Sequence, residues 1–562
     1  MSIFCWPHVR AGQAKSSNKT RNQLLHALHD KEARIRQIRK ITGVVGLSAA
    51  VIDHGETIFQ VNAGYRNLAK KEPVTSDTIF PIASLTKSFT GVCLDRLRDD
   101  NKLSFDDLIV THLAEARSRD PVVAENATIA DLLGHRTGLQ KADSIWLGAN
   151  GELMLTNEQT VALFAHLLPQ ASLRSRFIYS NFGYAVLGEI ITQASGQPYH
   201  LYLQEKVLGP LKMSRTVTTK ENGLPDDHTL AYSVLDNGEP YNVPLPASIA
   251  SGPMGSAGGL SSTVNDLAKY YKALMRAWRI QKQGGLARNK EAAGDLLSRN
   301  DITWLFTPLQ IMETPTFREK SYASGWGRSQ LPAAVGTFGV NPSMVDEMPL
   351  LADGLPKGSR LALWHQGSLV GATAFVMLLP ETESAVVVLT NTMAHNDAAD
   401  WIGQLLAETL LAEGPTSSNN DYVLLAEASK RRALEMYAEL TRKIDEGRTT
   451  GGPPRPLRDF VGRYVGFGGV YEIKIVETDD GGLDMLLQGR ESQRYRLLHH
   501  HEHTFTWFMT FNEQIKKARF ISYLPDPFFI TFKAEPGPMI TAIKWVHDVA
   551  GRPEGEILIR QL

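Results

Sequence analysis

The amino-acid sequence predicts an α+β domain built on one antiparallel sheet, followed by a small all-β domain. Two hairpin-like patterns lie near the two ends of the first region, and helical patterns fill the chain between them. A Gly/Pro-rich stretch at 446–456 is typical of a linker, and short strand-like runs follow it. The predicted organisation is a helical extension at 1–37, the α+β domain at 38–415, a helical connector and linker at 416–456, and the all-β domain at 457–562.

The elements of the α+β domain follow from their apolar spacing. Residues 21–43, "RNQLLHALHDKEARIRQIRKITG", have helical spacing that ends at Gly43. Residues 44–67 form two apolar runs around the turn "DHGE", and residues 371–391 repeat that form around "PETES". A helix is predicted at 397–414. Because one hairpin begins the domain and the other nearly ends it, we expect the two terminal segments to lie side by side in the sheet.

The C-terminal region has the strand spacing of a small antiparallel barrel or sandwich. Its aromatic side chains are numerous enough to form an apolar interior without a ligand. One alternative is a barrel that only packs against the first domain, and another is a barrel whose loop reaches the substrate site, for example around "HHHEH". The strand-like runs are "YEIKIVE", "LDMLLQ", "TFTWFMTF", "ARFISYL", "FFITFKA", "ITAIKWVH" and "GEILIRQL".

Composition excludes several classes of function. The chain has 562 residues with 59 basic and 60 acidic side chains, so its net charge does not favour binding to nucleic acid or to an anionic membrane surface. Only two cysteines occur, Cys5 and Cys93, and their spacing suits neither a metal site nor a disulfide framework. The first 20 residues lack the apolar run of a signal peptide, and no stretch has the length of a membrane span. We therefore expect a cytoplasmic protein.

Ser84 and Lys87 are the first candidate catalytic pair. Apolar spacing predicts that a helix begins near Ser84, where the helix dipole favours negative charge. Residues three apart share one helix face, so the Lys87 amine can reach the Ser84 hydroxyl. Serine becomes a good nucleophile when a base removes its proton, and lysine is a base only when it is partly neutral. The alternative is that Ser84 caps the helix and Lys87 is a solvated first-turn residue.

Two further stretches complete an ordered set of motifs. "FIYSNFGYAVLGEII" contains Tyr179-Ser180-Asn181, and "LWHQGSLVGATAFVMLLP" contains His365-Gln366-Gly367-Ser368. Together with Ser84-x-x-Lys87 they resemble, in order, the S-x-x-K, Ser/Tyr-x-Asn and K-T-G motifs of penicillin-recognising serine hydrolases. The resemblance covers about residues 38–412. It implies the β-lactamase/transpeptidase-like fold, in which an all-helical part accompanies the sheet, and a lipocalin-like barrel like those attached to some members.

This resemblance implies roles for the motif residues. Ser84 would attack an acyl carbonyl and form an acyl-enzyme, while Lys87 and Tyr179 share the proton transfers, Tyr179 being favoured as base if the Lys87 charge lowers its pKa. The backbone N–H groups of Ser84 and Ser368 would form an oxyanion hole. The other candidates position or bind the substrate: Asn181, His365, Gly367 and Trp326. Alternatively, Asn181 caps a helix, His365 is a surface histidine, and Tyr179 and Trp326 belong to the core.

Two departures refine the expected function. His365 replaces the lysine of many β-lactamases and transpeptidases, and the second motif begins with tyrosine; both are typical of the class C-like esterase, D-amino-acid peptidase and acyltransferase branch. We therefore expect a serine hydrolase or acyltransferase for a small-molecule ester, thioester or amide, such as a biosynthetic intermediate. A D-amino-acid peptidase or amidase, and an inactive binding or scaffold protein, remain alternatives.

No cofactor or metal is predicted. The "HHHEH" stretch at 499–503 resembles a metal tract, but alternate residues of a strand face opposite sides and no companion cluster completes a ligand set. The expected partner is the acyl substrate alone. The long stretch between 309 and 359 is a candidate substrate-shaping loop.

Overall fold

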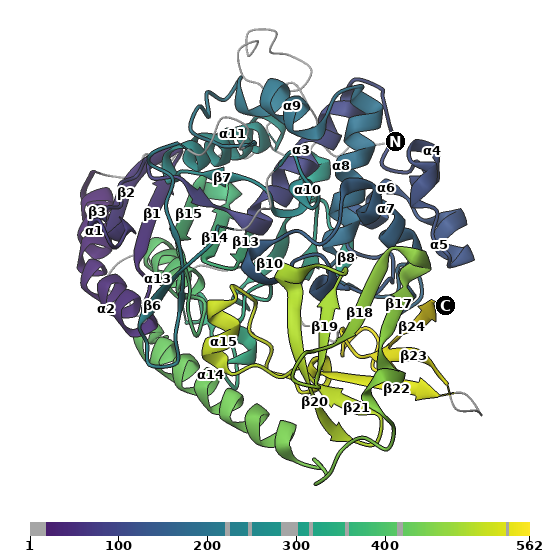
Figure 1. Cartoon of the computed structure of the whole chain (residues 1–562). Coiled ribbons are helices and arrows are strands. Elements are labelled where there is room, and N and C mark those ends of the chain that lie inside the picture. Colours follow the sequence, from purple (N-terminus) through teal and green to yellow (C-terminus); the bar gives the residue numbers. More distant parts are fainter. Residues whose placement is uncertain are drawn as a thin grey trace.

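The computed structural model describes residues 18–219, 225–245, 250–282, 302–313, 318–354, 359–412, 420–534 and 539–561. Figure 1 shows a large sheet with helices on both sides, and a barrel packed beside it. The barrel follows the long helix α14 (Tyr422–Asp445), which runs along the lower edge of the molecule in this view.

Within the described residues the sheet has nine strands, and its centre joins the two ends of the domain. β1 (Gly46–Asp53) pairs antiparallel with β15 (Ser384–Thr390), in a register that runs from Leu47–Thr390 to Ile52–Ala385. The expected juxtaposition of the two terminal hairpins is therefore confirmed. The remaining strands follow on either side in the order β3-β2-β1-β15-β14-β13-β10-β9-β8: β2 (Glu56–Asn67), β3 (Glu72–Pro73), β8 (Gln310–Ile311), β9 (Lys320–Tyr322), β10 (Gly327–Leu331), β13 (Arg360–Leu369) and β14 (Ala372–Leu379).

Both faces of the sheet are buried. Along β1, Ala49 and Val51 belong to one hydrophobic cluster while Ala50 and Ile52 belong to another, because successive strand residues point to opposite faces. This explains why the central strands are continuous apolar runs and do not alternate with polar residues. The first cluster is covered by α1 (Asn18–Asp30), α2 (Glu32–Thr42), α13 (Ala398–Leu411) and the start of α14.

The second face is covered by the helical part and by α11. These helices are α3 (Thr86–Asp99), α4 (Ile109–His112), α5 (Pro121–Asn126), α6 (Ile129–Leu133), α7 (Asn157–His166), α8 (Asn181–Ser195), α9 (Tyr199–Leu203), α10 (Gly255–Gly258), α11 (Val264–Lys282) and α12 (Thr303–Phe306). Short strands outside the large sheet form small sheets of their own. They are β4 (Phe80–Pro81) with β7 (Ser261–Ser262), β11 (Ala333–Ala334) with β12 (Leu350–Leu351), and β5 (Ala231–Val234) between β16 (Thr392–Met393) and β6 (Pro240–Val243).

The N-terminal helical stretch differs from the prediction in one respect. The single helix expected at 21–43 is two helices, separated at Lys31. Gly43 ends the second helix as predicted, because its φ of 79° lies in the left-handed region that glycine adopts without strain. α1 and α2 both pack on α13, so the break lets the two helices follow the curved surface of the sheet domain.

The C-terminal region is a closed antiparallel barrel of eight strands, which confirms the predicted fold class. Aromatic rings fill its interior: the Phe460 ring lies 5.1 Å from Phe505 and 4.9 Å from Phe532. The strands are β17 (Gly462–Gly466), β18 (Tyr471–Glu477), β19 (Leu483–Leu487), β20 (Arg494–His501), β21 (Thr504–Thr506), β22 (Phe529–Ala534), β23 (Ile540–Trp545) and β24 (Glu556–Gln561).

Some barrel strands were predicted wrongly. The stretch "ARFISYL" at 518–524 is not a strand, and only the first three residues of "TFTWFMTF" are. Thr510 and Glu513 form a capping box that starts helix α15 (Phe511–Lys516), and this local signal outweighs the apolar pattern around it. β17 and β20 were missed because glycines interrupt the first, and charged residues and histidines occupy most of the second.

α14 connects the two parts of the molecule through buried contacts. Its Tyr437 hydroxyl donates to the Met509 carbonyl at 2.5 Å and accepts from Gln514 at 2.6 Å. At its C-terminal end, the His500 ring lies 2.8 Å from the Ile444 carbonyl. The "HHHEH" stretch therefore lies against the end of α14. Among the residues that the structure describes, no helix is long and apolar enough to cross a membrane.

Candidate active site

Ser84 lies on a strained turn immediately before a helix. It is the middle residue of a short 3-10 helix, η1 (Ala83–Leu85), which leads into α3. Ala83 has a φ of 46°, a conformation that costs energy for any residue with a Cβ. Ser84 does not cap α3 with its side chain, so the helix-cap interpretation is wrong. The turn instead presents the hydroxyl at the start of the helix.

Lys87 is completely buried and its amine contacts three oxygen atoms. Its Nζ lies 3.1 Å from Ser84 Oγ, 2.8 Å from Asn181 Oδ1 and 2.7 Å from the Ala257 carbonyl. The side chain has 0% exposure, which contradicts the alternative of a solvated first-turn residue. The spacing of three residues therefore does bring amine and hydroxyl together.

Burial changes the protonation of Lys87. Loss of water around the amine lowers its pKa to about 7, and the charge of Asp143 opposes this shift only in part. Near neutral pH the amine is therefore partly deprotonated. A neutral amine has two N–H donors and one lone pair, which matches the three contacts if Asn181 and Ala257 accept the hydrogens and the lone pair accepts the Ser84 proton.

Asn181 connects Lys87 to an acidic residue. While its Oδ1 accepts from Lys87, its Nδ2 donates to Asp143 Oδ1 at 2.8 Å. This second bond fixes the orientation of the amide, so that the oxygen and not the nitrogen faces the amine. Ser180 caps α8 by accepting from the Gly183 N–H at 3.0 Å, which leaves Asn181 for the site and not for the cap.

Tyr179 lies beside Lys87 and Ser84. The Lys87 amine is 4.8 Å from the centre of the Tyr179 ring. The phenol oxygen is buried, and Ser84 is the neighbour whose hydrogen bonding acts on the pKa of the phenol. Burial raises the pKa of Tyr179 well above 10, and the neighbouring Ser84 side chain lowers it only in part. Tyr179 was favoured as the base only if the Lys87 charge lowers its pKa; that condition is not met, because burial dominates and keeps the phenol protonated near neutral pH.

His365 is also neutral, and it lies within an aromatic cluster. Burial lowers the pKa of its ring to about 3. Its Nδ1 donates to the Gln366 carbonyl, so its Nε2 accepts from the Tyr322 hydroxyl at 3.1 Å. The ring stacks on Phe338 at 4.4 Å and lies 6.0 Å from the Tyr179 ring. His365 is thus buried and not a surface residue, and it supports the site by packing and hydrogen bonding without adding charge.

Gly367 permits a close approach between β13 and the nucleophile turn. A Cβ at this position would lie 2.5 Å from the Ile82 carbonyl and 3.2 Å from Ala83, so any larger residue would push the two segments apart. Within the described residues, β10 pairs with β13 only as far as Trp364. The backbone of Ser368, further along β13, therefore has no described strand on the β10 side. The geometry thus places the two segments that carry the Ser84 and Ser368 N–H groups next to each other.

Trp326 is the one predicted binding residue that the structure places elsewhere. It has 1% exposure and packs in the hydrophobic core, with its ring 6.0 Å from Tyr271 and 6.5 Å from Phe306. Its assignment to substrate binding is therefore corrected to the core alternative. The large apolar side chain is used for packing.

Four residues near the site were missed by the sequence interpretation. His135 accepts from the Ser180 N–H at 3.0 Å and packs on Tyr179, so it holds the second motif in place. His135 lies in the stretch "GHRTGL". Tyr322 and Phe338 both come from the stretch 309–359 that was predicted to shape the substrate site, whereas Asp143 belongs to no predicted motif. Their positions in the fold bring these residues beside the motif residues.

Comparison with known proteins identifies the family. The family model described as Beta-lactamase matches residues 32–409, which is most of the chain. The chain therefore belongs to the β-lactamase family, whose members are typically serine hydrolases. The ordered motifs had predicted this relationship, and the match confirms it.

The curated relatives are distant. Unguisins hydrolase ungD' of Aspergillus campestris is 25% identical over 372 residues, covering 63% of this chain and 60% of that protein. The mitochondrial serine beta-lactamase-like protein LACTB of Homo sapiens is 22% identical over 425 residues, covering 63% of this chain and 72% of that protein. Unguisins hydrolase ungD of Aspergillus violaceofuscus is matched over 45% of its length at 26% identity. The chain thus spans about half the length of the unguisins hydrolases.

Solved structures share the architecture over nearly the whole chain. The octameric penicillin-binding protein homologue from Pyrococcus abyssi superimposes with a TM-score of 0.51 at 21% identity, covering 96% of this chain and 99% of that one. A structure of SurE gives a TM-score of 0.50 at 18% identity, covering 97% of this chain and 99% of that one. At these identities the likeness supports the fold alone.

Proposed function

We propose that this protein is a serine hydrolase or acyltransferase that forms a covalent acyl-enzyme at Ser84, with neutral Lys87 as the base. The contacts of Lys87 carry the proposal. Its amine is buried, its pKa is lowered to about 7, and two of its three oxygen contacts are acceptors that fix the amine hydrogens. The lone pair is then directed at the Ser84 hydroxyl, 3.1 Å away.

In the proposed acylation, Ser84 Oγ attacks the carbonyl carbon of the substrate while its proton moves to Lys87 Nζ. A bond forms between Oγ and the carbonyl carbon, and the carbonyl oxygen becomes an oxyanion. The backbone N–H groups of Ser84 and Ser368 are the proposed donors to that oxyanion. Gly367 supports this assignment, because it allows β13 to approach the turn that carries Ser84.

Collapse of the intermediate breaks the bond to the leaving group, which needs a proton. The buried Tyr179 hydroxyl beside Ser84 is the proposed donor to the leaving atom, and it recovers a proton from the protonated Lys87 amine. A neutral phenol suits this role, since burial keeps it protonated. Water or another nucleophile then attacks the acyl carbonyl, and these two outcomes distinguish hydrolysis from acyl transfer.

The proposed substrates are small esters, thioesters or amides, including biosynthetic intermediates. The aromatic side chains around His365 favour a substrate with an apolar part near the reacting carbonyl. The names of two relatives, the unguisins hydrolases, support testing unguisins as substrates. A role in secondary metabolism is part of the proposal. The proposed compartment is the cytoplasm, as the sequence predicted, and imaging of a tagged full-length chain tests it.

The proposal is tested by labelling with a fluorophosphonate probe, followed by intact-mass measurement and peptide mapping. One adduct at Ser84, absent in Ser84→Ala, is the expected result. Ester, thioester and amide substrates are then compared for trapped acyl-enzyme and for release to water or to an added amine or alcohol. Absence of any adduct, together with full cellular activity of Ser84→Ala, would instead indicate a binding or scaffold protein.

A further inference from the structure

The barrel contacts the chain segment that carries Asp143. This segment, residues 139–155, runs over the barrel surface and contains the short 3-10 helix η3 (Asp143–Ile145). The barrel residues nearest Asp143 lie in the turn between β23 and β24, which are drawn in yellow in Figure 1. One of the two alternatives from the sequence was a barrel loop, for example around "HHHEH", that reaches the substrate site; residues 547–548 of a different loop contact the Asp143 segment.

Two consecutive barrel residues hold the chain on both sides of Asp143. Before it, the backbone N–H groups of Lys141 and Ala142 both donate to Asp548 Oδ2, at 3.1 and 3.3 Å. After it, Ser144 Oγ lies 3.0 Å from His547 Nδ1 and donates to the His547 carbonyl at 3.2 Å. Ala142 has a φ of 50°, so the two bonds from Asp548 hold a conformation that the chain would otherwise leave.

A second barrel contact fixes the other end of the segment. The Gln493 side chain accepts from the Ala149 N–H at 2.7 Å and donates to the Ala149 carbonyl at 3.1 Å. Arg490 donates to Glu152 at 2.7 Å. The segment is therefore tied to the barrel at both ends, while Asp143 points back to Asn181.

Asp143 then acts on the base through one hydrogen-bonded residue. Its carboxylate holds Asn181 Nδ2, which turns Asn181 Oδ1 toward the Lys87 amine. The carboxylate also raises the pKa of Lys87 through its charge, against the larger effect of burial. The position of Asp143 therefore controls both the orientation of the Lys87 amine and the pH at which it becomes a base.

We propose that Asp548 and His547 of the barrel are positioning residues for acylation, acting through the chain Asp143–Asn181–Lys87. This inference rests on the proposed function and adds a role for the barrel in it. Neither residue touches the substrate. Each holds the segment that places the Asp143 carboxylate, and a shift of the base by a fraction of an ångström is enough to slow proton transfer.

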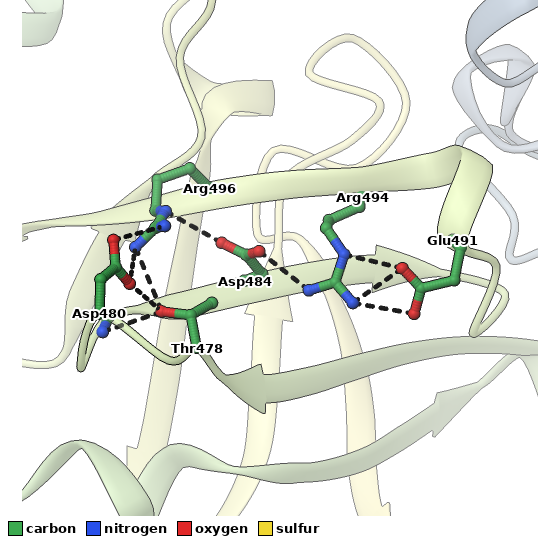
Figure 2. A network of polar contacts seen from close by, with 7 residues as sticks. Thr478, Asp480, Asp484, Glu491, Arg494 and Arg496 are labelled. Carbon is green, nitrogen blue, oxygen red and sulfur yellow. Dashed lines mark hydrogen bonds and ion pairs between the residues drawn. The ribbon is translucent and has the colours of Figure 1, made fainter.

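The test compares two Asp→Ala variants of the same barrel. Asp548→Ala removes the contact to the Asp143 segment. Asp480→Ala is the matched control, since Asp480 belongs to a surface network in which Arg496 pairs with Asp480 and Asp484, while Arg494 pairs with Asp484 and Glu491 (Figure 2). The rate of fluorophosphonate labelling of Ser84 is measured for the full-length variants from pH 5 to 9.

We expect Asp548→Ala to lower the labelling rate about 10- to 100-fold, the range for a misplaced catalytic group, and Asp480→Ala to leave it unchanged. The apparent pKa of labelling should fall in Asp143→Ala, because Lys87 loses the charge that raises its pKa, whereas Asp548→Ala keeps the Asp143 carboxylate and should act on the rate. Asp548→Asn keeps an oxygen acceptor for the two N–H groups and should largely restore the rate.

A double variant distinguishes positioning from general stability. If Asp548 acts through Asp143, then Asp548→Ala should add little to the effect of Asp143→Ala. Multiplicative effects, or a wild-type rate in Asp548→Ala, would overturn the inference. If Asp548→Ala does not fold, Ser144→Ala removes the His547 contact from the other side and should also lower the labelling rate; an unchanged rate there overturns the inference too. Failure of the wild-type chain to label at Ser84 would instead refute the proposed function.

Discussion

Neighbouring residues of β13 belong to two different buried polar clusters. His365 lies on the face of the sheet with Tyr179 and Tyr322, while Gln366 donates to Asp400 at 3.0 Å on the opposite face. Both clusters are buried, and both contain groups with displaced pKa values. Burial lowers the pKa of Lys87 in the first, and burial together with mutual repulsion raises the pKa of Asp397 in the second.

The two clusters differ in what their polar groups face. Asp400 receives hydrogen bonds from Asn341, Gln404 and Gln366, and Asp397 caps α13. These bonds link the helix to the sheet. In the first cluster a base faces a nucleophile, and the protonated Tyr179 hydroxyl lies beside that nucleophile. A shifted pKa therefore shows that a group is buried. Only the arrangement of a nucleophile, a base and an available proton donor identifies a catalytic site.

The largest expected effects are on the nucleophile and base of the first cluster. Ser84→Ala should abolish acylation, because Ser84 is the hydroxyl that contacts the Lys87 amine in the part of the chain that the structure describes. Lys87→Ala should lower the acylation rate by about two to four orders of magnitude, the usual scale for loss of a general base. Rates are measured by fluorophosphonate labelling with intact-mass detection. Asp397→Asn, on the other face, should leave the rate close to wild type; a comparable loss there would remove the distinction between the clusters.

Tyr179→Phe should have a smaller effect that depends on the leaving group. We expect a loss of about 100-fold for an alkyl ester or amide, whose leaving atom needs a proton, on the general scale for acid catalysis. A nitrophenyl ester needs no such proton and should lose much less. The ratio of the two rates is measured in wild type and variant. An equal loss for both substrates would exclude Tyr179 as the proton donor and leave it a packing role.

Substitutions in the second cluster should change the stability of the protein and not the rate of acylation. The pKa of Asp397 is raised in the folded state, so its contribution is fully present below the ordinary aspartate pKa and is lost as pH rises through the folded value. Asp397→Asn removes this loss and should stabilise the protein at pH 9 by on the order of 1 kcal/mol, with little change at pH 4. Thermal unfolding at both pH values measures it. A variant less stable at pH 9 would mean that the carboxylate is needed to cap α13.

Asp480, a surface carboxylate, should respond in the opposite way to an Asp→Asn substitution. Hydrogen bonds from Arg496 and Thr478 lower the pKa of Asp480 to about 2. Its contribution is present above the ordinary aspartate pKa and is lost as pH falls, so Asp480→Asn should not gain stability at pH 9. A gain in both variants would show that the effect comes from net charge and not from burial.

Features that depend on residues close together in the sequence could be predicted, whereas contacts between residues far apart in the sequence could not. Apolar runs around "DHGE" and "PETES" predicted the hairpins that meet as β1 and β15, and the spacing of Ser84 and Lys87 predicted their contact. The ordered motifs added Tyr179, Asn181 and His365. The hairpins and the Ser84–Lys87 pair are local patterns, and the three motifs occur in the same order as in a known family.

Asp143 and Asp548 gave no such signal. Asp143 lies 38 residues before Asn181, and Asp548 lies far beyond the last motif; both are in stretches without periodicity. Asp548 contacts the segment of Asp143 only because the barrel packs against the helical part. The pKa of Lys87 was equally hidden, since it depends on how completely the fold excludes water from one amine. Trp326 shows the converse error, because sequence does not reveal which large aromatic is surrounded on all sides.

The central claim, that a neutral Lys87 activates Ser84, is tested most directly by the pH dependence of Ser84 labelling in the wild-type chain and in Lys87→Ala. Burial lowers the pKa of Lys87 to about 7, so the wild-type rate should rise between pH 5 and 9 with an apparent pKa near that value. Lys87→Ala should be slow and should lose this titration. A wild-type rate that does not change across this range, or an adduct that maps to Ser180 or Ser368, would contradict the account.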